Sequence, residues 1–183
     1  LDVTAVTGHT AETSIADGDT ILIHDASASA LRKMTKANFV SGIGGTNTPA
    51  FMVKLSAEQN ITNATWTKIT FDSEVYDTNN TFGSNKFTPG VAGRYNFMLQ
   101  VSIDDLGDQT AIYLQIYKNG SAEPTSLTRL YGAKTEKQTS WCNWSNLADD
   151  DDYYEAYVYH DIGSTKPLRV DMSTIWMGYK IIE

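Results

Sequence analysis

The stretch Phe87-Thr-Pro-Gly-Val-Ala-Gly-Arg-Tyr-Asn-Phe97 decides the fold of this 183-residue chain. Pro89 and Gly90 favour a turn, and Gly93 supplies a permissive backbone position just before the next strand. From Tyr95 onward, Tyr, Phe, Leu and Val alternate with Asn, Met and Gln, which is the period-two pattern of a β-strand. A turn, a glycine corner and a core strand therefore predict an all-β domain.

Strand patterns recur on both sides of this stretch, and no helical period is visible after residue 50. The predicted strands are Phe51–Leu55, Thr67–Phe71, Tyr95–Val101, Thr110–Lys118, Thr125–Tyr131, Thr139–Leu147, Tyr153–His160 and Leu168–Ile182, the last with a break near Ser173. Spacings of roughly 8–12 residues between turn signals are typical of a sandwich. Asp72 to Lys86 is predicted to be a loop anchored by Val75, Tyr76 and Phe82. We therefore expect an antiparallel β-sandwich over residues 46–183.

Residues 1–45 form a separate predicted module ahead of this domain. Thr20–His24 and Ala30–Met34 are expected to pair as a hairpin, and Thr35 is the predicted N-cap of a short helix over Lys36–Ser41. Gly, Thr, Asn and Pro residues between positions 42 and 49 mark the boundary. A hairpin with one helical turn buries little apolar surface, so we expect it to pack on a second domain or on copies of itself.

The composition excludes several classes of protein. A formal net charge of −8 and a pI near 4.8 argue against a nucleic-acid-binding protein, which needs a basic face. Cys142 is the single cysteine, so no internal disulfide or cysteine-based zinc site can form. No membrane-span length, catalytic triad or phosphate loop stands out, so we expect neither membrane insertion nor enzymatic activity. Because the sequence opens on Leu1, we expect it to be part of a longer chain.

The strand spacing over residues 50–183 resembles the C1q/TNF-like jelly-roll family. The opening stretch looks like the family's F-x-x-P-x-x-G-x-Y-x-F core, although Pro89 stands one position early. Further matches are Phe51, Ile69-Thr-Phe71, Tyr76-Asp77, Phe82, the hairpin Lys118-Asn-Gly120 and the closing strand Trp176-Met-Gly-Tyr-Lys-Ile181. A second departure lies at Leu147 to Asp152, where the family has an apolar residue followed by Gly-Asp. The resemblance implies an antiparallel jelly-roll β-sandwich behind a small hairpin-and-helix module.

The N-terminal module carries a second resemblance. Ile15-Ala-Asp-Gly-Asp-Thr-Ile-Leu-Ile-His-Asp25, followed by Leu31-Arg-Lys-Met-Thr35 and Asn38-Phe39, is similar to a short module of phage tail fibre and neck fibre proteins. A C1q-like domain behind such a module implies the receptor-binding end of a phage fibre, and both kinds of protein are typically homotrimers.

These resemblances give the expected function. We expect a fibre-tip adhesin, extracellular on the virion and joined to the rest of the fibre and tail. It would bind a bacterial surface polysaccharide or an outer-membrane receptor. Two alternatives stay open: a trimerisation and folding cap without receptor contact, and a secreted C1q-like binding domain.

Aromatic side chains supply the candidate binding residues. Tyr113 and Tyr117 share a face of one predicted strand, and Tyr153, Tyr157 and Tyr159 share a face of another. Such faces stack on sugar rings or pack against a neighbouring protomer. The residues favoured for a trimer interface are Tyr113, Tyr117, Tyr157 and Tyr159, and those favoured for receptor binding are Trp141, Tyr153 and Tyr157. Because Trp141 and Trp144 lie on opposite faces of one strand, one is expected in the core and the other outside.

The run Asp149 to Asp152 is the densest concentration of charge in the sequence. Adjacent carboxylates repel one another and can be neutralised by a hard cation with oxygen ligands, so Asp149, Asp150 and Asp152 are candidate ligands for Ca²⁺. The spacing is not that of a calcium-binding loop of the Asp-x-Asp-x-Asp-Gly type, and a solvated turn is the favoured explanation of the run. We expect no other cofactor.

Overall fold

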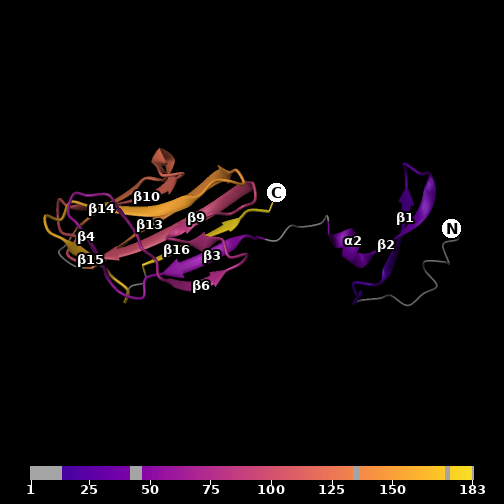
Figure 1. Ribbon diagram of the computed structural model, residues 1–183, viewed down its shortest axis with the longest axis horizontal. Helices are drawn as coiled ribbons and strands as arrows, with labels where there is room; N and C mark the ends of the chain where they lie inside the picture. Colours follow the sequence, from indigo (N-terminus) through magenta and orange to yellow (C-terminus); the bar gives the residue numbers. More distant parts are fainter. Residues whose placement is uncertain (1–13, 42–46, 134–136, 172–173, 183) are drawn as a thin grey trace. The chain divides into compact units, whose positions relative to one another are not determined.

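The computed structural model describes residues 14–41, 47–133, 137–171 and 174–182. The chain divides into two compact units, Leu1–Gly45 and Thr46–Glu183, here called the N-terminal module and the head. Figure 1 shows the strands of each unit.

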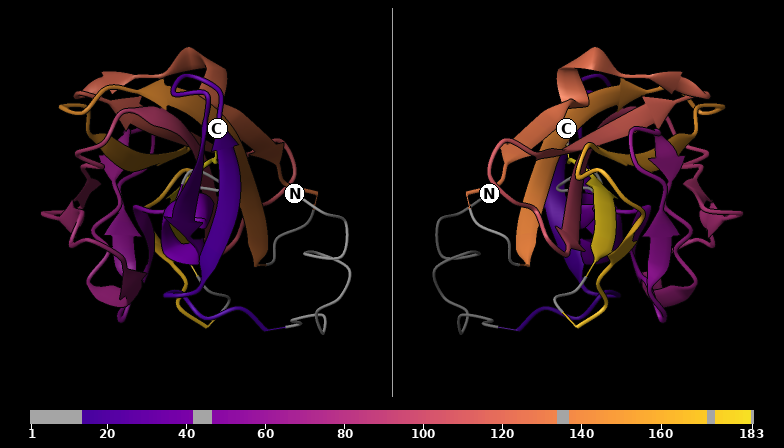
Figure 2. Two further views of the ribbon diagram at one scale, coloured as in Figure 1. Left: turned by 90° about the vertical axis from the view of Figure 1, so that its right-hand side faces the viewer. Right: turned by 90° about the vertical axis from the view of Figure 1, so that its left-hand side faces the viewer.

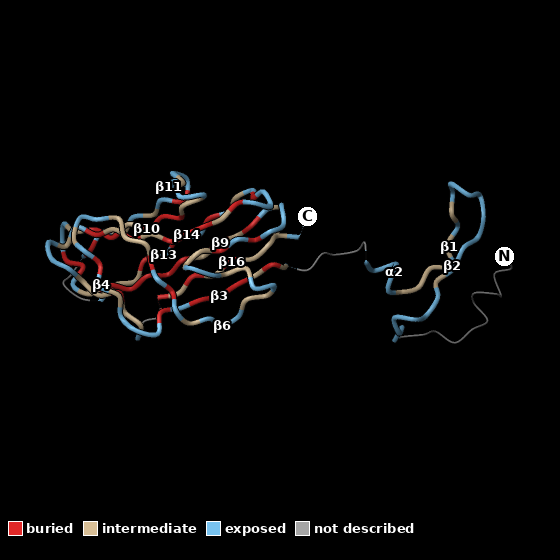
Figure 3. Tube along the Cα trace, viewed as in Figure 1, coloured by how far each residue is buried: buried red, intermediate tan, exposed pale blue. Residues whose placement is uncertain are grey.

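The N-terminal module is a hairpin followed by a short helix. Strands β1 (Thr20–Asp25) and β2 (Ala30–Thr35) pair antiparallel, and α2 covers Lys36–Val40. The Thr35 hydroxyl accepts a hydrogen bond from the Asn38 backbone N–H at 3.3 Å, so Thr35 is the N-cap, as predicted. None of the described residues 14–41 is buried, as the pale-blue and tan tube of Figure 3 shows.

The described part of the head consists of short strands and one 3₁₀ turn. They are β3 (Ala50–Lys54), β4 (Gln59–Ile61), β5 (Thr67–Lys68), β6 (Ser73–Asp77), β7 (Phe82–Gly83), β8 (Lys86–Phe87), β9 (Gly93–Ile103), β10 (Ala111–Lys118), β11 (Ser121–Ala122), η1 (Pro124–Ser126), β12 (Thr128–Tyr131), β13 (Gln138–Ala148), β14 (Tyr154–His160), β15 (Lys166–Leu168) and β16 (Ile175–Lys180). One sheet has the order β4-β15-β9-β16-β3-β6, with β13 also paired to β9. The other has the order β11-β10-β14-β8-β7, with β12 on β10 and β5 on β14. We call them the β9 sheet and the β10 sheet.

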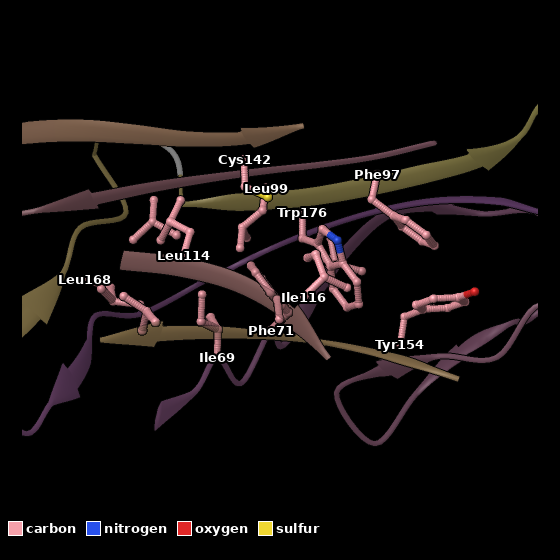
Figure 4. Close-up of a cluster of buried hydrophobic side chains, with 14 of the residues drawn as sticks. Ile69, Phe71, Phe97, Leu99, Leu114, Ile116, Cys142, Tyr154, Leu168 and Trp176 are labelled. Atoms are coloured by element: carbon pink, nitrogen blue, oxygen red, sulfur yellow. The ribbon is translucent and has the colours of Figure 1, made fainter. Parts of the chain in front are cut away.

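The two sheets enclose one hydrophobic core, seen end-on in Figure 2 and as the red segments of Figure 3. Leu99 of β9 and Cys142 of β13 pair across the β9 sheet, and both point into the interior that Leu114 and Ile116 of β10 also fill (Figure 4). The predicted period-two alternation of apolar side chains is confirmed in β9, β10 and β14, because the core side chains stand at every second position. They are Tyr95, Phe97, Leu99 and Val101 in β9, Ile112, Leu114 and Ile116 in β10, and Tyr154, Ala156 and Val158 in β14.

The stretch from Phe87 to Phe97 forms the corner at which the chain crosses from β8 to β9. Gly90 and Gly93 both adopt positive φ angles, +65° and +145°, which favour glycine. Tyr95 is fully buried, and its hydroxyl donates a hydrogen bond of 2.8 Å to the Val91 carbonyl. The corner is therefore closed by the first core side chain of the strand that it introduces.

The region from Asp72 to Lys86 differs from the prediction of a loop. It contains β6, β7 and β8, and Val75 and Tyr76 are 52% and 39% exposed instead of acting as anchors. A β-bulge accounts for the exposure of Val75. The register of β6 on β3 shifts between Tyr76 and Glu74, which leaves Val75 as the extra residue. Phe82 does pack against the core, as predicted.

Strand register defines the two ends of the head. The chain enters β3 at Ala50, which pairs with Tyr179 near the end of β16, and we call this the linker end. The Asn119–Gly120 turn and the turn between β13 and β14 also lie there, because Ala148 pairs with Gly93 at the start of β9. Loops 104–110 and 161–165 lie at the opposite, far end, near β4 and β15 in Figure 1.

Candidate functional site

The outer side of the β9 sheet is an uncharged surface, here called the methionine face. Its residues are Ala50, Met52, Asn96, Met98, Gln100, Trp141, Asn143, Ser145, Ile175, Met177 and Tyr179. Cross-strand register places Met52, Met177 and Met98 in one row across β3, β16 and β9. Lys54 and Arg94 stand at the two ends of this surface.

β13 contributes the most exposed aromatic side chain of the methionine face. Trp141 is 54% exposed, whereas Trp144 on the inner side is 7% exposed and stacks on Phe97 with ring centroids 5.9 Å apart. The prediction that one tryptophan lies in the core and the other outside is therefore confirmed. Leu147, on the same outer side of β13, is also exposed.

The outer side of the β10 sheet is an aromatic surface, here called the tyrosine face. Its residues are Trp66, Lys68, Tyr113, Gln115, Tyr117, Arg129, Tyr131, Glu155, Tyr157 and Tyr159. The four tyrosines predicted to form a trimer interface, Tyr113, Tyr117, Tyr157 and Tyr159, are thus brought together on one surface. Whether they contact another chain stays a prediction.

Trp66, which precedes β5, organises the rings of the tyrosine face. Its ring centroid lies 5.5 Å from that of Tyr159 and 6.4 Å from that of Tyr113. Tyr117 and Tyr157 stack on each other at 3.9 Å, and burial raises the pKa of both hydroxyls. The rings are therefore held against one another before any ligand or partner arrives.

Two cations on the tyrosine face have different surroundings. Lys68 Nζ lies 2.6 Å from Glu155 Oε1 in a largely buried ion pair. Arg129 is exposed, and its guanidinium carbon lies 4.4 Å from the ring centroid of Tyr131 and 5.7 Å from that of Tyr113. A hydrogen bond to the Tyr113 hydroxyl raises the pKa of Arg129.

The three residues predicted to bind a receptor do not share a surface. Trp141 is on the methionine face and Tyr157 is on the tyrosine face. Tyr153 precedes β14 at the linker end, where Lys86 Nζ lies 4.6 Å from its ring centroid. The sequence pattern showed which side chains point outward, but it could not show that they belong to separate surfaces.

The acidic run at the linker end does not have the geometry of a calcium site. Asp152 is 5% exposed, and its carboxylate is bound by Lys118 Nζ at 2.7 Å, Asn119 Nδ2 at 2.7 Å and the Asp149 backbone N–H at 2.6 Å. Burial alone would raise the pKa of Asp152, but these three donors bring it below its usual range. Asp149 and Asp150 point into an exposed turn, so the three predicted ligands do not converge on one ion.

Sequence reasoning missed a network of charges at the far end. Arg169 pairs with three carboxylates, those of Glu58, Asp104 and Asp171, and Lys137 also contacts Asp171 at 2.7 Å. Hydrogen bonds from Arg169 and Lys137 lower the pKa of Asp171. These residues are far apart in the sequence, so no local motif signals the network.

A buried histidine lies beneath the same far-end loops. His160 is fully buried, with Nε2 3.0 Å from the Ile61 carbonyl oxygen and Nδ1 accepting from the Ile162 backbone N–H at 3.4 Å. Burial lowers the pKa of His160, against the raising effect of the Ile61 hydrogen bond and of Asp161. The neutral ring therefore ties β4 to the loop that follows β14.

Two further observations concern only the described part of the chain. Within residues 14–41, 47–133, 137–171 and 174–182, no group of three or more His, Cys, Asp or Glu side chains could hold a metal ion. In the same ranges, no helix is long and apolar enough to cross a membrane.

Comparison with known proteins places the fold. The globular domain of zebrafish complement 1qA matches with a TM-score of 0.50 and 17% identity, over 73% of this chain and 98% of that one. Murine APRIL at pH 5.0 matches with a TM-score of 0.55 and 10% identity, over 72% of this chain and 98% of that one. The fold is a C1q/TNF-like jelly roll. No protein-family model matches the chain, and no curated protein sequence matches it.

The jelly roll was predicted from the opening stretch and its spacing, and both structural matches confirm it. Identities of 10–17% establish the shared fold alone. The resemblance of residues 15–39 to phage fibre modules is not addressed by either match, so it stays a prediction.

Proposed function

We propose that the chain is the tip of a phage tail fibre and that it adheres as a homotrimer to a receptor on the bacterial surface. The C1q/TNF-like jelly roll supplies the head, and the segment from Ile15 to Phe39 supplies the resemblance to fibre proteins. The role is one of binding at the outside of a virion, without a chemical reaction.

The observation that carries the proposal is the methionine face. Cores of protein interfaces are depleted in charged residues and enriched in Met and aromatic residues, which is the composition of this surface. Trp141 is exposed and the row Met52, Met177 and Met98 is partly exposed on the same side of the sheet, so a neighbouring protomer that covered them would remove apolar surface from water. We therefore assign the contact between protomers to this face, in place of the tyrosine face that the sequence favoured.

This assignment leaves the tyrosine face and the far-end loops for the receptor. A trimer carries three copies of each surface on one rigid body. Several weak contacts made at once can exceed a single contact by about 10²–10⁴ in apparent affinity. Far-end loops lie at the opposite end of the head from Ala50, where the chain enters it, so they are remote from the point of attachment.

Adsorption of the purified full-length chain to a panel of bacterial strains tests the proposal. The expected result is saturable binding to a subset of strains, lost when cell-surface polysaccharide or outer-membrane protein is removed. Met177→Lys should reduce adsorption because it disperses the trimer. If the trimer binds no strain across the panel, the adhesin proposal is wrong.

A second candidate function is favoured by the same methionine face. A head that only trimerises would register three fibre chains and close their ends without touching a host. Deletion of residues 46–183 would then abolish fibre assembly, and intact trimers would show no adsorption to any strain. An assembled fibre whose shortened form no longer adsorbs excludes this second function.

A further inference from the structure

Arg129 on β12 is a cation without a carboxylate partner among the residues that the structure describes. By contrast, five other cations of the head pair with carboxylates: Lys68, Lys118, Lys137, Lys166 and Arg169. In a chain of net charge −8, carboxylates are abundant, so an exposed guanidinium that none of the described ones reaches is a distinct feature.

The rings around Arg129 hold its guanidinium in one place. Its guanidinium carbon lies 4.4 Å from the ring centroid of Tyr131 and 5.7 Å from that of Tyr113, which is within the range of cation–π attraction. A guanidinium that contacts rings through its faces keeps the N–H donors at its edge for hydrogen bonding, and Arg129 is exposed. A planar fork of N–H groups matches a carboxylate, which accepts two parallel hydrogen bonds from it.

A cluster of aromatic rings continues from Arg129 across the sheet. Register aligns Arg129 on β12 with Tyr113 on β10 and Tyr159 on β14. The rings of Tyr113 and Tyr159 meet edge to face, and Trp66 packs against both of them. Aromatic rings offer an apolar surface with polar edges, which suits the C–H face of a sugar ring. The row therefore combines a surface for a sugar ring with a donor for its acid group.

We propose that the tyrosine face binds an acidic saccharide, with its carboxylate on Arg129 and its ring on Tyr113, Tyr159 and Trp66. This inference rests on the proposed adhesin function and names the chemical class of its receptor: a surface polysaccharide that contains uronic-acid-type sugars. The local cation offsets the repulsion that the net negative protein exerts on an anionic ligand, a repulsion that salt screens beyond about 8–10 Å.

Calorimetric titration of the full-length chain with tetragalacturonic acid tests the inference. Its methyl ester, in which every carboxylate is neutral, is the matched probe. The acid should bind, and the ester should bind at least about tenfold more weakly, since charge-assisted hydrogen bonds contribute about 1.5–3 kcal/mol. Arg129→Gln should weaken binding of the acid about tenfold to a hundredfold, which is the loss of affinity that corresponds to the same free energy.

Two further variants make the test specific. Arg129→Lys keeps the charge but lacks the planar fork, so it should also weaken binding. Lys54→Gln removes an exposed cation at the edge of the methionine face and should leave binding unchanged. Arg129 is exposed, so the variants should keep the far-ultraviolet dichroism of the parent chain.

Several results would overturn the inference. They are equal binding of acid and ester, full binding by Arg129→Gln, or no binding of the acid at millimolar concentration.

Adsorption to cells separates failure of this inference from failure of the adhesin proposal. If cells are bound equally by the parent chain and by Arg129→Gln, the adhesin proposal stands and the inference fails. If the acid binds through Arg129 but no strain is adsorbed, the inference stands and the adhesin proposal fails.

Discussion

Gly178 of β16 sits where two aromatic rings of the core meet. It pairs with Phe51 on one side and with Phe97 on the other. A Cβ atom at this position would lie 2.6 Å from Phe97 Cδ1 and 2.8 Å from Phe51 Cε1, which is too close for any real contact. The glycine of the closing-strand motif is therefore a packing requirement of the core.

Gly178→Ala should destabilise the head by about 2–3 kcal/mol, because overpacking forces buried rings out of their preferred rotamers. The midpoint of urea denaturation measures the change. Gly83→Ala is the matched control, since no atom lies within 4 Å of its added Cβ, and it should change stability by less than about 0.5 kcal/mol. Equal losses in both variants would contradict the packing explanation.

His160 should make stability depend on pH. Its folded-state pKa lies below the ordinary value of 6.5, so the folded state binds fewer protons than the unfolded state as the pH falls below 6.5. The contribution of the neutral ring is complete above pH 6.5 and is lost as the pH falls through the lower folded-state pKa. Protonated Nδ1 can no longer accept from the Ile162 N–H, which adds a local reason for the loss.

Urea denaturation at pH 7.5 and at pH 5 measures this dependence. The parent chain should lose stability at the lower pH, and His160→Gln should lose less, because Gln keeps a donor for the Ile61 carbonyl but does not titrate. Asp161 and Lys166, which also act on His160, are unchanged in both proteins. Identical pH dependence of the two would show that other groups cause the loss.

At the scale of elements, Asp152 joins two hairpins. Its carboxylate connects the turn between β13 and β14 to Lys118 and Asn119 at the end of β10. Asn119 completes the connection, since its Oδ1 accepts from the Tyr153 N–H. The acidic run thus contains one structural carboxylate, and the exposed Asp151 is not part of the connection.

Asp152→Asn should cost about 2–3 kcal/mol in stability, because it leaves the half-buried Lys118 ammonium without its counter-charge. Asp151→Ala, in the same turn, should be within about 0.5 kcal/mol of the parent chain. Thermal melting with and without millimolar Ca²⁺ completes the test. A melting temperature that rises with Ca²⁺ in the parent chain but not in Asp152→Asn would restore the calcium site.

The sequence predicted the long elements of this fold better than the short ones. The apolar residues of β9, β10 and β14 recur at every second position and are buried, so each strand shows its period in its own sequence. The two-residue strands β7 and β8 exist because Phe82 pairs with Phe87 and Phe87 with Tyr154, and such partners are set by the tertiary fold. The bulge at Val75 likewise depends on the register of β6 against β3.

The candidate sites show a similar limit. Alternation indicated that Tyr113 and Tyr157 lie on outer faces and that one of Trp141 and Trp144 lies outside, and the structure agrees. It could not assign them to different sheets, nor place Trp66 over Tyr159, because both depend on how distant strands pair. No sequence pattern pointed to Arg129, because its distinctive feature is that no carboxylate among the described residues pairs with it.

At the scale of the whole molecule, the two outer faces predict different effects of an added charge. Met177→Lys places an ammonium in the middle of the methionine face and should convert the trimer to monomers. Tyr117→Lys places the same charge on the tyrosine face and should leave the trimer intact. Light scattering at micromolar concentration measures both masses.

The paired variants decide between two interfaces. A trimer that survives Met177→Lys and dissociates with Tyr117→Lys would return the interface to the tyrosines that the sequence favoured. A parent chain that is monomeric at micromolar concentration would exclude both. Far-ultraviolet dichroism of each variant shows that the sheets are retained.

The pairing of Ala50 with Tyr179 puts the start of the first strand of the head and the end of its last strand at the same end. A head with this geometry can be fused to another protein at residue 46 or at its C-terminal end. In either fusion the far-end loops stay unobstructed. For protein engineers, the same geometry makes the far-end loops 104–110 and 161–165 a place to display inserted sequences away from the point of attachment.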